Sequence, residues 1–335
     1  MNQHVSILKT GFVAFILIFL NLILLTSIAF SADKIKGMPD SIQIGSGTVG
    51  GGFYVQAGLI ASVLEKELKI PVSAQPTSGS RENVRLLDTQ KIHLALIAAN
   101  NGYPAYTGTG GYDKKYGILA PIIYLYPNVC FYIALESSGI RSFKDLKGKR
   151  VGWPSRTWDQ TIIIPWFKAH GMDTKKDIKI VYSGFGNLHS QLRDGSLDAC
   201  VTCLNAGKYP IPATSELMSR KKLTFITFEK SAQKTIGDTL PYMEAADIQM
   251  GQFEQQQKVL SVDIGGPQLY ARRDMSEEAV YTIASMVHKN LNQLAERNKI
   301  FTYALENQAA LVRNIGVPFH PGAIKYWKEA GLWKN

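Results

Sequence analysis

Short apolar runs alternate with amphipathic segments from Ser41 onward, and this alternation sets the expected architecture. The first part predicts a strand, helix, strand, helix, strand order, with strands at 41–44, 72–75 and 93–98 and helices at 53–68 and 80–89. The connections between these segments are short. Because strand–helix–strand crossovers are right-handed, such a unit folds into a parallel sheet with helices on its faces.

A second unit of the same kind begins at Cys130. Its pattern predicts strands at 130–135, 149–153, 178–183 and 197–202, with helices at 142–146, 161–170 and 187–195. The two units are organised alike, but they show no literal sequence repeat. At 335 residues, the chain is long enough for two domains.

The last third of the chain has a different pattern. Residues 247–257 are polar and turn-like, residues 261–272 carry a strand, and residues 276–297 have the periodicity of one long helix. Ser276 is expected to cap that helix rather than to take part in a site. A final short helix follows Pro321.

The N-terminal segment is typical of a secretory signal peptide. Lys9 precedes an almost unbroken apolar run over residues 12–25, and small and polar residues follow through Ala32. We therefore expect a signal peptide at residues 1–32 and a periplasmic location for the rest of the chain. The alternative is an uncleaved membrane anchor, because residues 12–30 are just long enough to span a bilayer.

The formal charge of +10 does not indicate a nucleic-acid interface. Basic residues are scattered, and the densest runs, at 144–150, 175–179 and 220–222, contain no interleaved aromatic residues. We interpret them as solvated surface that leaves a mild attraction for anionic ligands.

The three cysteines, Cys130, Cys200 and Cys203, are too few for a disulfide scaffold. Cys200 and Cys203 have neither the flanking residues of a redox motif nor a nearby histidine pair for zinc. We expect small buried residues, and a local disulfide between Cys200 and Cys203 is the alternative.

The stretch "SIQIGSGTVGGGFYVQAG" contains a G-x-G-x-x-G match at Gly45, Gly47 and Gly50. A dinucleotide loop also needs an acidic residue at the end of the second strand to bind the ribose. That strand ends instead in Gln75-Pro76-Thr77, and export argues further against a nucleotide cofactor. No cofactor is therefore expected.

The glycine-rich loop can still bind an anion when no dinucleotide is involved. A glycine-rich turn between a strand and a helix brings backbone N–H groups to a helix N-terminus, where an anion or a polar oxygen binds favourably. Two further hydroxyl-rich loops, at 77–80 and 153–158, have the same strand-to-helix position. Because all three would emerge at the carboxyl ends of strands, they suggest a cleft between two lobes. The alternatives are ordinary helix capping for the hydroxyls and core packing for the aromatics.

Several longer segments resemble a known family. These are "IGSGTVGGGFYVQAG", "AQPTSGSRENVRLLDTQKIHLALIAANNGYPAYTGTG", "SGIRSFKDLKGKRVGWPSRT", "LRDGSLDACV" and "HPGAIKYWKEAG". Together they resemble the TAXI-type solute receptors of TRAP transporters, over nearly the whole chain after the signal segment. The resemblance implies a type II periplasmic-binding-protein fold: an α/β protein of two lobes joined by two crossing strands, with a ligand enclosed between them.

The resemblance also implies a domain division and a site. Lobe 1 would comprise residues 33–126 and 230–335, and lobe 2 residues 127–229. Carried over by position, with the loop aromatics added, the ligand-binding residues would be Ser46, Thr48, Phe53, Tyr54, Thr77, Ser80, Asn100, Trp153, Ser155, Arg156, Thr157 and Trp158, with Asn83 behind Thr77 and Ser80.

Three positions depart from the family pattern. Arg156 replaces a glycine of the second-lobe loop, Arg81 replaces a small apolar residue, and Asn100 stands in place of an aspartate. If Arg156 points into the cleft, its planar guanidinium suits a carboxylate. If it points outward, it is a surface charge.

The expected function is therefore capture of a small organic anion or amino acid and its delivery to a TRAP permease, by a monomer without metal or catalytic activity. The alternative is a ligand-binding subunit of an ABC transporter or of a sensory system. No triad-like cluster indicates an enzyme. Each histidine is expected to be packed or at the surface, and His320 is expected to tie or cap the last helix.

Overall fold

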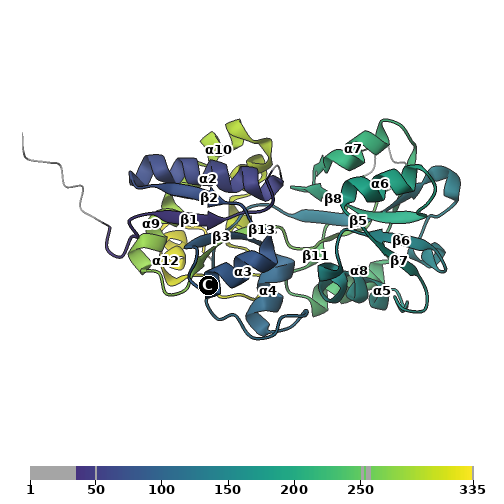
Figure 1. Ribbon diagram of the computed structural model, residues 1–335, viewed down its shortest axis with the longest axis horizontal. Coiled ribbons are helices and arrows are strands. Elements are labelled where there is room, and N and C mark those ends of the chain that lie inside the picture. Colours follow the sequence, from purple (N-terminus) through teal and green to yellow (C-terminus); the bar gives the residue numbers. More distant parts are fainter. Residues whose placement is uncertain (1–34, 50, 250–252, 254–257, 334–335) are drawn as a thin grey trace, which may run out of the picture.

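The computed structural model describes residues 35–49, 51–249, 253 and 258–333, and the expected signal peptide lies outside these residues. The described chain forms two α/β lobes side by side (Figure 1), with the first and last parts of the chain in one lobe and the middle part in the other. The expected fold class is thus confirmed. Among the residues described, no helix is long and apolar enough to cross a membrane.

Lobe 1 is built on a five-stranded sheet. Its order is β2 (Val72–Gln75), β1 (Ile42–Gly45), β3 (Leu94–Ala98), β13 (Pro267–Arg272) and β4 (Leu119–Tyr124). The first three strands are parallel, as predicted, while β13 runs antiparallel to both of its neighbours. The sheet is therefore mixed, because the strand in its interior comes from the end of the chain.

Lobe 2 is built on an eight-stranded sheet. Its main order is β11 (Glu244–Ala245), β12 (Val262–Asp263), β5 (Asn128–Leu135), β8 (Ala199–Asn205), β6 (Arg150–Trp153) and β7 (Lys179–Tyr182). Two further strands, β10 (Leu223–Ile226) and β9 (Tyr209–Pro210), pair with β5 and β8. The strands β6, β7 and β8 are parallel, so their carboxyl ends share one edge of the sheet.

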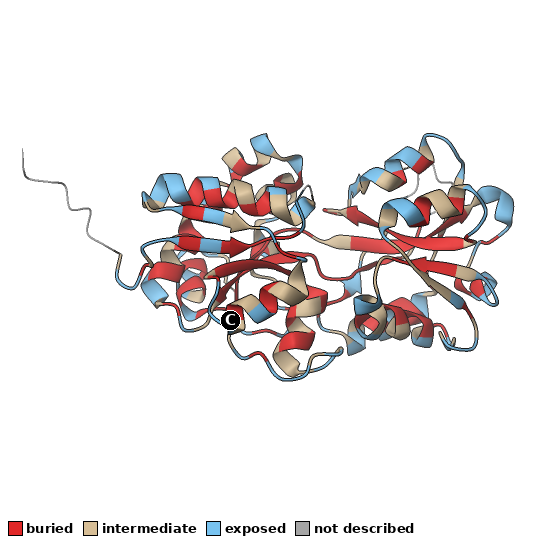
Figure 2. Cartoon of the chain, viewed as in Figure 1, coloured by how far each residue is buried: buried red, intermediate tan, exposed pale blue. Residues whose placement is uncertain are grey.

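Helices cover both sheets. Those of lobe 1 are α2 (Gly52–Leu68), α3 (Ser80–Asp88), α4 (Ala99–Thr107), α9 (Glu277–Lys289), α10 (Leu291–Arg297), α11 (Thr302–Glu306) and α12 (Pro321–Glu329). Those of lobe 2 are the π-helical turn η4 (Asp159–Ile163), α5 (Ile164–Ala169), α6 (Phe185–Arg193), α7 (Pro212–Met218) and α8 (Lys230–Thr239). Figure 2 shows buried strands at the centre of each lobe and helices that are exposed along their outer faces.

The two lobes are joined where β4 continues into β5 and where β12 continues into β13. The return to lobe 1, expected after residue 229, lies instead at residues 264–266. The reason is that α8 packs on α5, and that β11 and β12 pair along the edge of the lobe 2 sheet. The crossings touch, because a Cβ at Gly266 would overlap the carbonyl oxygen of Tyr126.

The end of the chain is locked onto lobe 1. Ser276 caps α9 by accepting the N–H of Ala279, as predicted. His320 caps α12 by accepting the N–H of Gly322, and its Nε2 lies 3.1 Å from the carbonyl oxygen of Met275. Both expectations for these two residues are confirmed. The predicted long helix over 276–297, however, is wrong, since it divides at Asn290 into α9 and α10.

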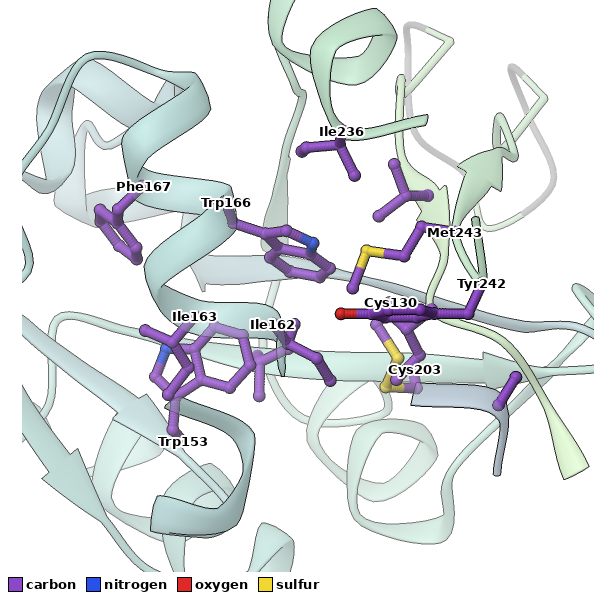
Figure 3. Packing of buried hydrophobic residues seen from close by; sticks show 14 of the residues in the cluster. Cys130, Trp153, Ile162, Ile163, Trp166, Phe167, Cys203, Ile236, Tyr242 and Met243 are labelled. Atoms are coloured by element: carbon purple, nitrogen blue, oxygen red, sulfur yellow. A yellow bond between two sulfur atoms is a disulfide. The ribbon is translucent and has the colours of Figure 1, made fainter. Parts of the chain in front are cut away.

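The core of lobe 2 is rich in aromatic rings and contains a disulfide (Figure 3). Tyr132, Trp153 and Trp166 are fully buried, with neighbouring ring centroids 5.4 to 6.1 Å apart. Such edge-to-face pairs add about 0.5–1.5 kcal/mol each beyond their area burial.

All three cysteines are buried, as expected, but the pairing differs from the local disulfide considered as the alternative. Cys130 on β5 is bonded to Cys203 on β8, while Cys200 is free and buried. The antiparallel register places Cys130 directly opposite Cys203. Cys200 lies three residues before Cys203 on the same strand, so the two side chains point to opposite faces and cannot bond locally.

Candidate functional site

The strand-to-helix loops of lobe 1 are held together by Asn83. Its side-chain Nδ2 donates to the carbonyl oxygens of Ser46 and Leu96, both at 2.8 Å. Its Oδ1 accepts the hydroxyl of Thr77 at 2.8 Å. Asn83 is fully buried, and its amide joins the residues after β1 and β2 to the middle of β3.

The predicted hydroxyls of Ser46, Thr77 and Ser80 already have partners within lobe 1. Ser46 is buried and its hydroxyl donates to the carbonyl of Gln75, while the hydroxyl of Ser80 accepts the N–H of Ala98. These bonds fix the backbone of the loops. The structure thus brings Ser46, Thr77 and Ser80 together, with Asn83 behind them.

Other predicted residues lie around this network. Thr48 is exposed, and Phe53 and Tyr54 are half-buried in the first turn of α2. Gly51 caps α2 without a side-chain hydrogen bond, so the helix start presents backbone N–H groups. Asn100 is buried in the first turn of α4, and its Oδ1 accepts the side-chain amide of Asn101.

The predicted loop of lobe 2 follows β6. Ser155 accepts the N–H of Thr157 and starts a short 3-10 turn over Arg156–Trp158. The side chain of Arg156 is exposed and stacks on the ring of Tyr182, with Cζ 4.5 Å from the ring centroid. Among the described residues, no carboxylate lies within ion-pair distance of Arg156.

Tyr182 is a residue that the sequence analysis did not select. It ends β7, and its hydroxyl donates to a carboxylate oxygen of Asp159 at 2.7 Å. Partial burial, with the adjacent Asp159 carboxylate, raises the pKa of Tyr182 to about 12, so it remains a neutral donor. Only the alignment of β6 and β7 brings Tyr182 beneath Arg156, which is why spacing along the chain gave no signal.

The two predicted tryptophans lie in different environments. Trp153 is fully buried between Tyr132 and Trp166, which is the core-packing alternative raised by the sequence analysis. Trp158 is half-buried between Trp153 and Phe185, with ring centroids 5.8 and 6.1 Å away.

The loop that follows α4 contacts lobe 2 close to the predicted lobe 2 loop. Arg81 donates to the carbonyl oxygens of Gly110 and Gly111 and stacks on Tyr112 at 4.5 Å. A Cβ at Gly110 would lie 2.7 Å from the Thr161 side chain of lobe 2. Arg81 therefore braces the loop that meets η4, the turn that follows the predicted loop of lobe 2.

A separate cavity of about 770 Å³ lies between the lobes, beside the two chain crossings. It is lined by Pro127, Val129, Ala206, Gly207, Lys208, Glu244, Ala245, Ala246, Asp247, Phe253, Asp263, Tyr303, Glu306 and Asn307. None of the twelve predicted ligand-binding residues is among them. In lobe 2 the cavity follows β11 and β12, at the opposite edge of the sheet from β6 and β7.

The histidines have structural environments. His170 stacks on Phe143 with ring centroids 3.6 Å apart, and His189 bonds to Thr214 and to the carbonyl of Phe185. Burial lowers the pKa of both imidazoles. In the part of the chain described here, no group of three or more His, Cys, Asp or Glu side chains is arranged to hold a metal ion.

Comparisons with known proteins address the fold and the family. The model of a family described as the NMT1-like family matches residues 44–331. The structure of XAC2383 from Xanthomonas citri bound to ATP superposes with a TM-score of 0.53 at 9% identity, covering 88% of this chain and 97% of that chain.

Two further solved structures are similar. XAC2383 bound to chloride ion gives a TM-score of 0.51 at 9% identity, covering 88% of this chain and 98% of that chain. The periplasmic aliphatic sulphonate binding protein SsuA from Escherichia coli gives 0.47 at 15% identity, covering 87% and 83% of the two chains. At such identities the likeness concerns the fold, which is the two-lobed type II periplasmic-binding architecture.

Proposed function

The chain belongs to the NMT1-like family, and we propose that it is an exported receptor that captures a small organic anion between its lobes and delivers it to a membrane permease. The proposed site is formed by the loops after β1, β2 and β3 and the loop after β6. Two lobes joined by only two crossings can close on such a ligand by a hinge motion. No covalent chemistry is proposed for these residues.

The environment of Arg156 is the observation that supports an anionic ligand. Its guanidinium is exposed, rests on the Tyr182 ring and has no ion-paired carboxylate among the described residues. A stacked guanidinium is pre-organised, and its fork of donors suits a carboxylate, a sulfonate or a phosphate. Exposed backbone donors at the start of α2 favour the same charge from lobe 1.

A thermal-shift screen of the mature chain tests this proposal. The panel contains monocarboxylates and dicarboxylates, amino acids, aliphatic sulfonates and ATP, because the similar structures include a sulphonate-binding protein and an ATP-bound protein. A ligand at one hundred times its dissociation constant stabilises the protein by about 2.7 kcal/mol. A panel without any stabilising compound would argue against a receptor for anions.

Two variants locate the ligand. Arg156→Gly is expected to weaken binding of the stabilising anion by about tenfold or more, the loss of one charge-assisted contact. Arg193→Gly removes a half-buried arginine at the end of α6 that is paired with Asp194, and is expected to leave the affinity unchanged. Equal binding by Arg156→Gly and the parent protein would remove Arg156 from the proposed site.

We propose a TRAP permease of the TAXI type as the partner, because the segments that resemble that family extend over nearly the whole mature chain. An ABC permease is the second candidate, because the family match alone does not select a permease class. Uptake assays in vesicles separate the two. Uptake that depends on this chain and on a sodium gradient supports the first, and dependence on ATP supports the second.

A further inference from the structure

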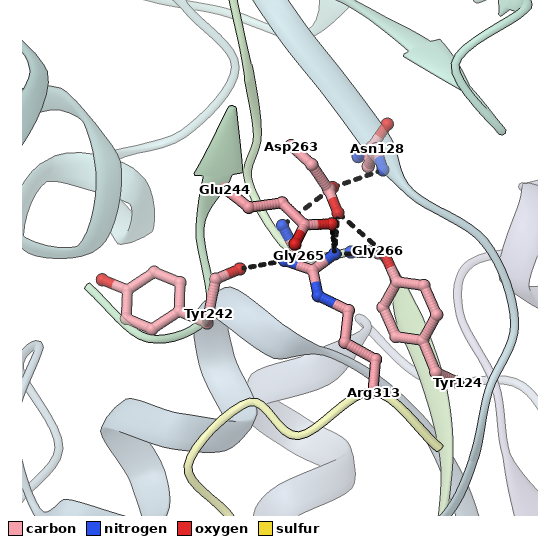
Figure 4. A network of polar contacts seen from close by, with 8 residues as sticks. All are labelled: Tyr124, Asn128, Tyr242, Glu244, Asp263, Gly265, Gly266 and Arg313. Carbon is pink, nitrogen blue, oxygen red and sulfur yellow. Dashed lines mark hydrogen bonds and ion pairs between the residues drawn. The ribbon is translucent and has the colours of Figure 1, made fainter. Parts of the chain in front are cut away.

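Asp263 is the centre of a buried polar network at the crossing between the lobes (Figure 4). One carboxylate oxygen accepts the backbone N–H groups of Asn128 and Gly265, at 2.7 and 3.0 Å. The other accepts the hydroxyl of Tyr124 at 2.8 Å and a guanidinium N–H of Arg313. Because Asn128 belongs to the first crossing and Gly265 to the second, this fully buried carboxylate ties both crossings together.

Arg313 extends this network from lobe 1 to lobe 2. It follows the last 3-10 turn of lobe 1, and its Nη1 lies 2.9 Å from the Tyr124 hydroxyl. The same Nη1 lies 3.0 Å from a carboxylate oxygen of Glu244 on β11, and Nη2 lies 3.5 Å from the carbonyl of Tyr242. The guanidinium thus bridges a lobe 1 segment and the edge strand of lobe 2.

The two carboxylates that Arg313 contacts differ in their freedom. The Asp263 side chain is 1% exposed and has four donors, whereas the Glu244 side chain is 59% exposed. Breaking the Asp263 contact would leave a buried charge with fewer partners, which is costly. Glu244 reaches solvent and is rehydrated when it separates from Arg313. The Asp263 contact is therefore the fixed part of the network, and the Glu244 contact is the part that can be released.

The cavity of about 770 Å³ leaves room for the lobes to move at this edge. Lobe 1 contributes Tyr303, Glu306 and Asn307 to its lining, and lobe 2 contributes the turn after β8 and the strand β11. A second ion pair between the lobes, Lys208 with Glu306 at 3.5 Å, spans it. Both partners of that pair are more than half exposed, so it contributes little.

We propose that the Arg313–Glu244 ion pair is a clasp that holds the two lobes in the arrangement of this structure. Its release shifts the lobes to a second arrangement about the Asp263 pivot. A contact made in only one of two arrangements shifts the equilibrium by its own free energy. The clasp goes beyond the proposed function, and only its effect on ligand affinity rests on that function.

Pulsed electron–electron double resonance tests the clasp by measuring distances between two spin labels. The full mature chain is used, without any solute. Spin labels are placed at Glu65→Cys on α2 and Ser215→Cys on α7, both exposed, in a Cys200→Ala background. In Glu244→Gln, which keeps the side-chain size, the ratio of the two arrangements is expected to change about fivefold, the amount that a partly buried ion pair supplies. A second distance peak would appear.

Two controls separate the clasp from a general charge effect. Glu306→Gln removes the exposed pair that spans the same cavity and is expected to move the distances less than Glu244→Gln. Asp238→Asn removes an exposed pair within α8 and is expected to move nothing.

An unchanged distance distribution in folded Glu244→Gln would overturn the clasp. If that variant does not fold, Glu244→Asp, which keeps the charge and shortens the side chain, is measured against the same criterion. Because no solute is present, a negative result in the solute screen and a negative result here are independent of each other.

Discussion

In lobe 1 the hydroxyls of Ser46 and Thr77 are committed to partners within the lobe, whereas in lobe 2 the guanidinium of Arg156 is exposed on the ring of Tyr182. The lobe 1 loops are thus fixed through a buried amide, Asn83, and offer mainly their backbone. The lobe 2 loop displays a charge. In the proposed site, lobe 1 would therefore supply mainly a fixed backbone, and the lobe 2 loop would supply the charged side chain that contacts the solute.

The two lobes also differ in what holds their cores together. All three cysteines lie in lobe 2, where Cys130 and Cys203 are bonded, while lobe 1 has none. Lobe 1 instead relies on helices packed closely at its end, where a Cβ at Gly322 would overlap the carbonyl oxygen of Glu277. A substitution in the core of one lobe should therefore lower the unfolding free energy of that lobe more than that of the other.

The largest expected effect comes from removing the disulfide. The Cys130→Ala, Cys203→Ala double variant should lose about 2–4 kcal/mol of unfolding free energy, because the bond closes a long loop in the unfolded chain. Urea denaturation measures the loss, and hydrogen exchange should place it in β5 and β8. Faster exchange in lobe 1 to the same extent would show that the lobes do not unfold separately.

The next effect is expected at Asn83. Asn83→Ala leaves the buried carbonyls of Ser46 and Leu96 without their donor and should cost about 2–3 kcal/mol by urea denaturation. The matched change in lobe 2, Arg156→Ala, should cost less than about 0.5 kcal/mol because that side chain is exposed. If Asn83→Ala and Arg156→Ala lose equal unfolding free energy, the lobe 1 loops and the lobe 2 loop do not differ in the way proposed.

Acid should affect both lobes together. Burial lowers the pKa of His93 and His320 in lobe 1 and of His170 and His189 in lobe 2. A histidine with a lowered folded-state pKa contributes stability above its unfolded pKa of about 6.5 and loses it as the pH falls below that value. Each contributes at most about 1.4 kcal/mol per pH unit.

Thermal melting from pH 8 to pH 5 checks this expectation. The midpoint should be flat above pH 7 and fall below about pH 6.5, and His170→Gln should make the fall shallower. If hydrogen exchange shows that only one lobe loses stability at low pH, the expectation that histidines of both lobes contribute is wrong.

The smallest effect is expected at Tyr182. Tyr182→Phe removes the bond to Asp159 but keeps the ring beneath Arg156, so it should cost about 0.5–1.5 kcal/mol of stability. Binding of a stabilising anion should change little. Tyr182→Ala also removes the ring and should weaken that binding, which titration calorimetry would show; equal affinities for the two variants would argue that the stack does not position Arg156.

Much of the fold followed from the hydrophobic pattern. The strands β1, β2 and β3 and the helices α2 and α3 lie where alternation and helical periodicity predicted them. The pattern failed where tertiary contacts override local preference. The helix α4 contains Gly102 and Pro104, which argue against a helix, and yet it forms where Tyr270 and the crossing at Gly265 and Gly266 pack against it.

Contacts between distant residues were the second source of error. The Cys130–Cys203 bond depends on the register of β5 against β8, which no local spacing reveals. The strands β11 and β12 have two residues each and are too short to show a period, so the return to lobe 1 was placed too early. Ser46, Thr77 and Ser80 belong to one hydrogen-bonded network in lobe 1, but the position of Tyr182 beneath Arg156 needed the pairing of β6 with β7.

The place of β13 between β3 and β4 has a consequence for biogenesis. The chain is synthesised from its N-terminus, and β13 begins at Pro267, after all of lobe 2 has emerged. Until then β3 and β4 each have an unpaired edge, which is open to association with other chains. Lobe 2 can therefore finish folding while lobe 1 is still incomplete, so that the earliest residues to emerge are among the last to be protected.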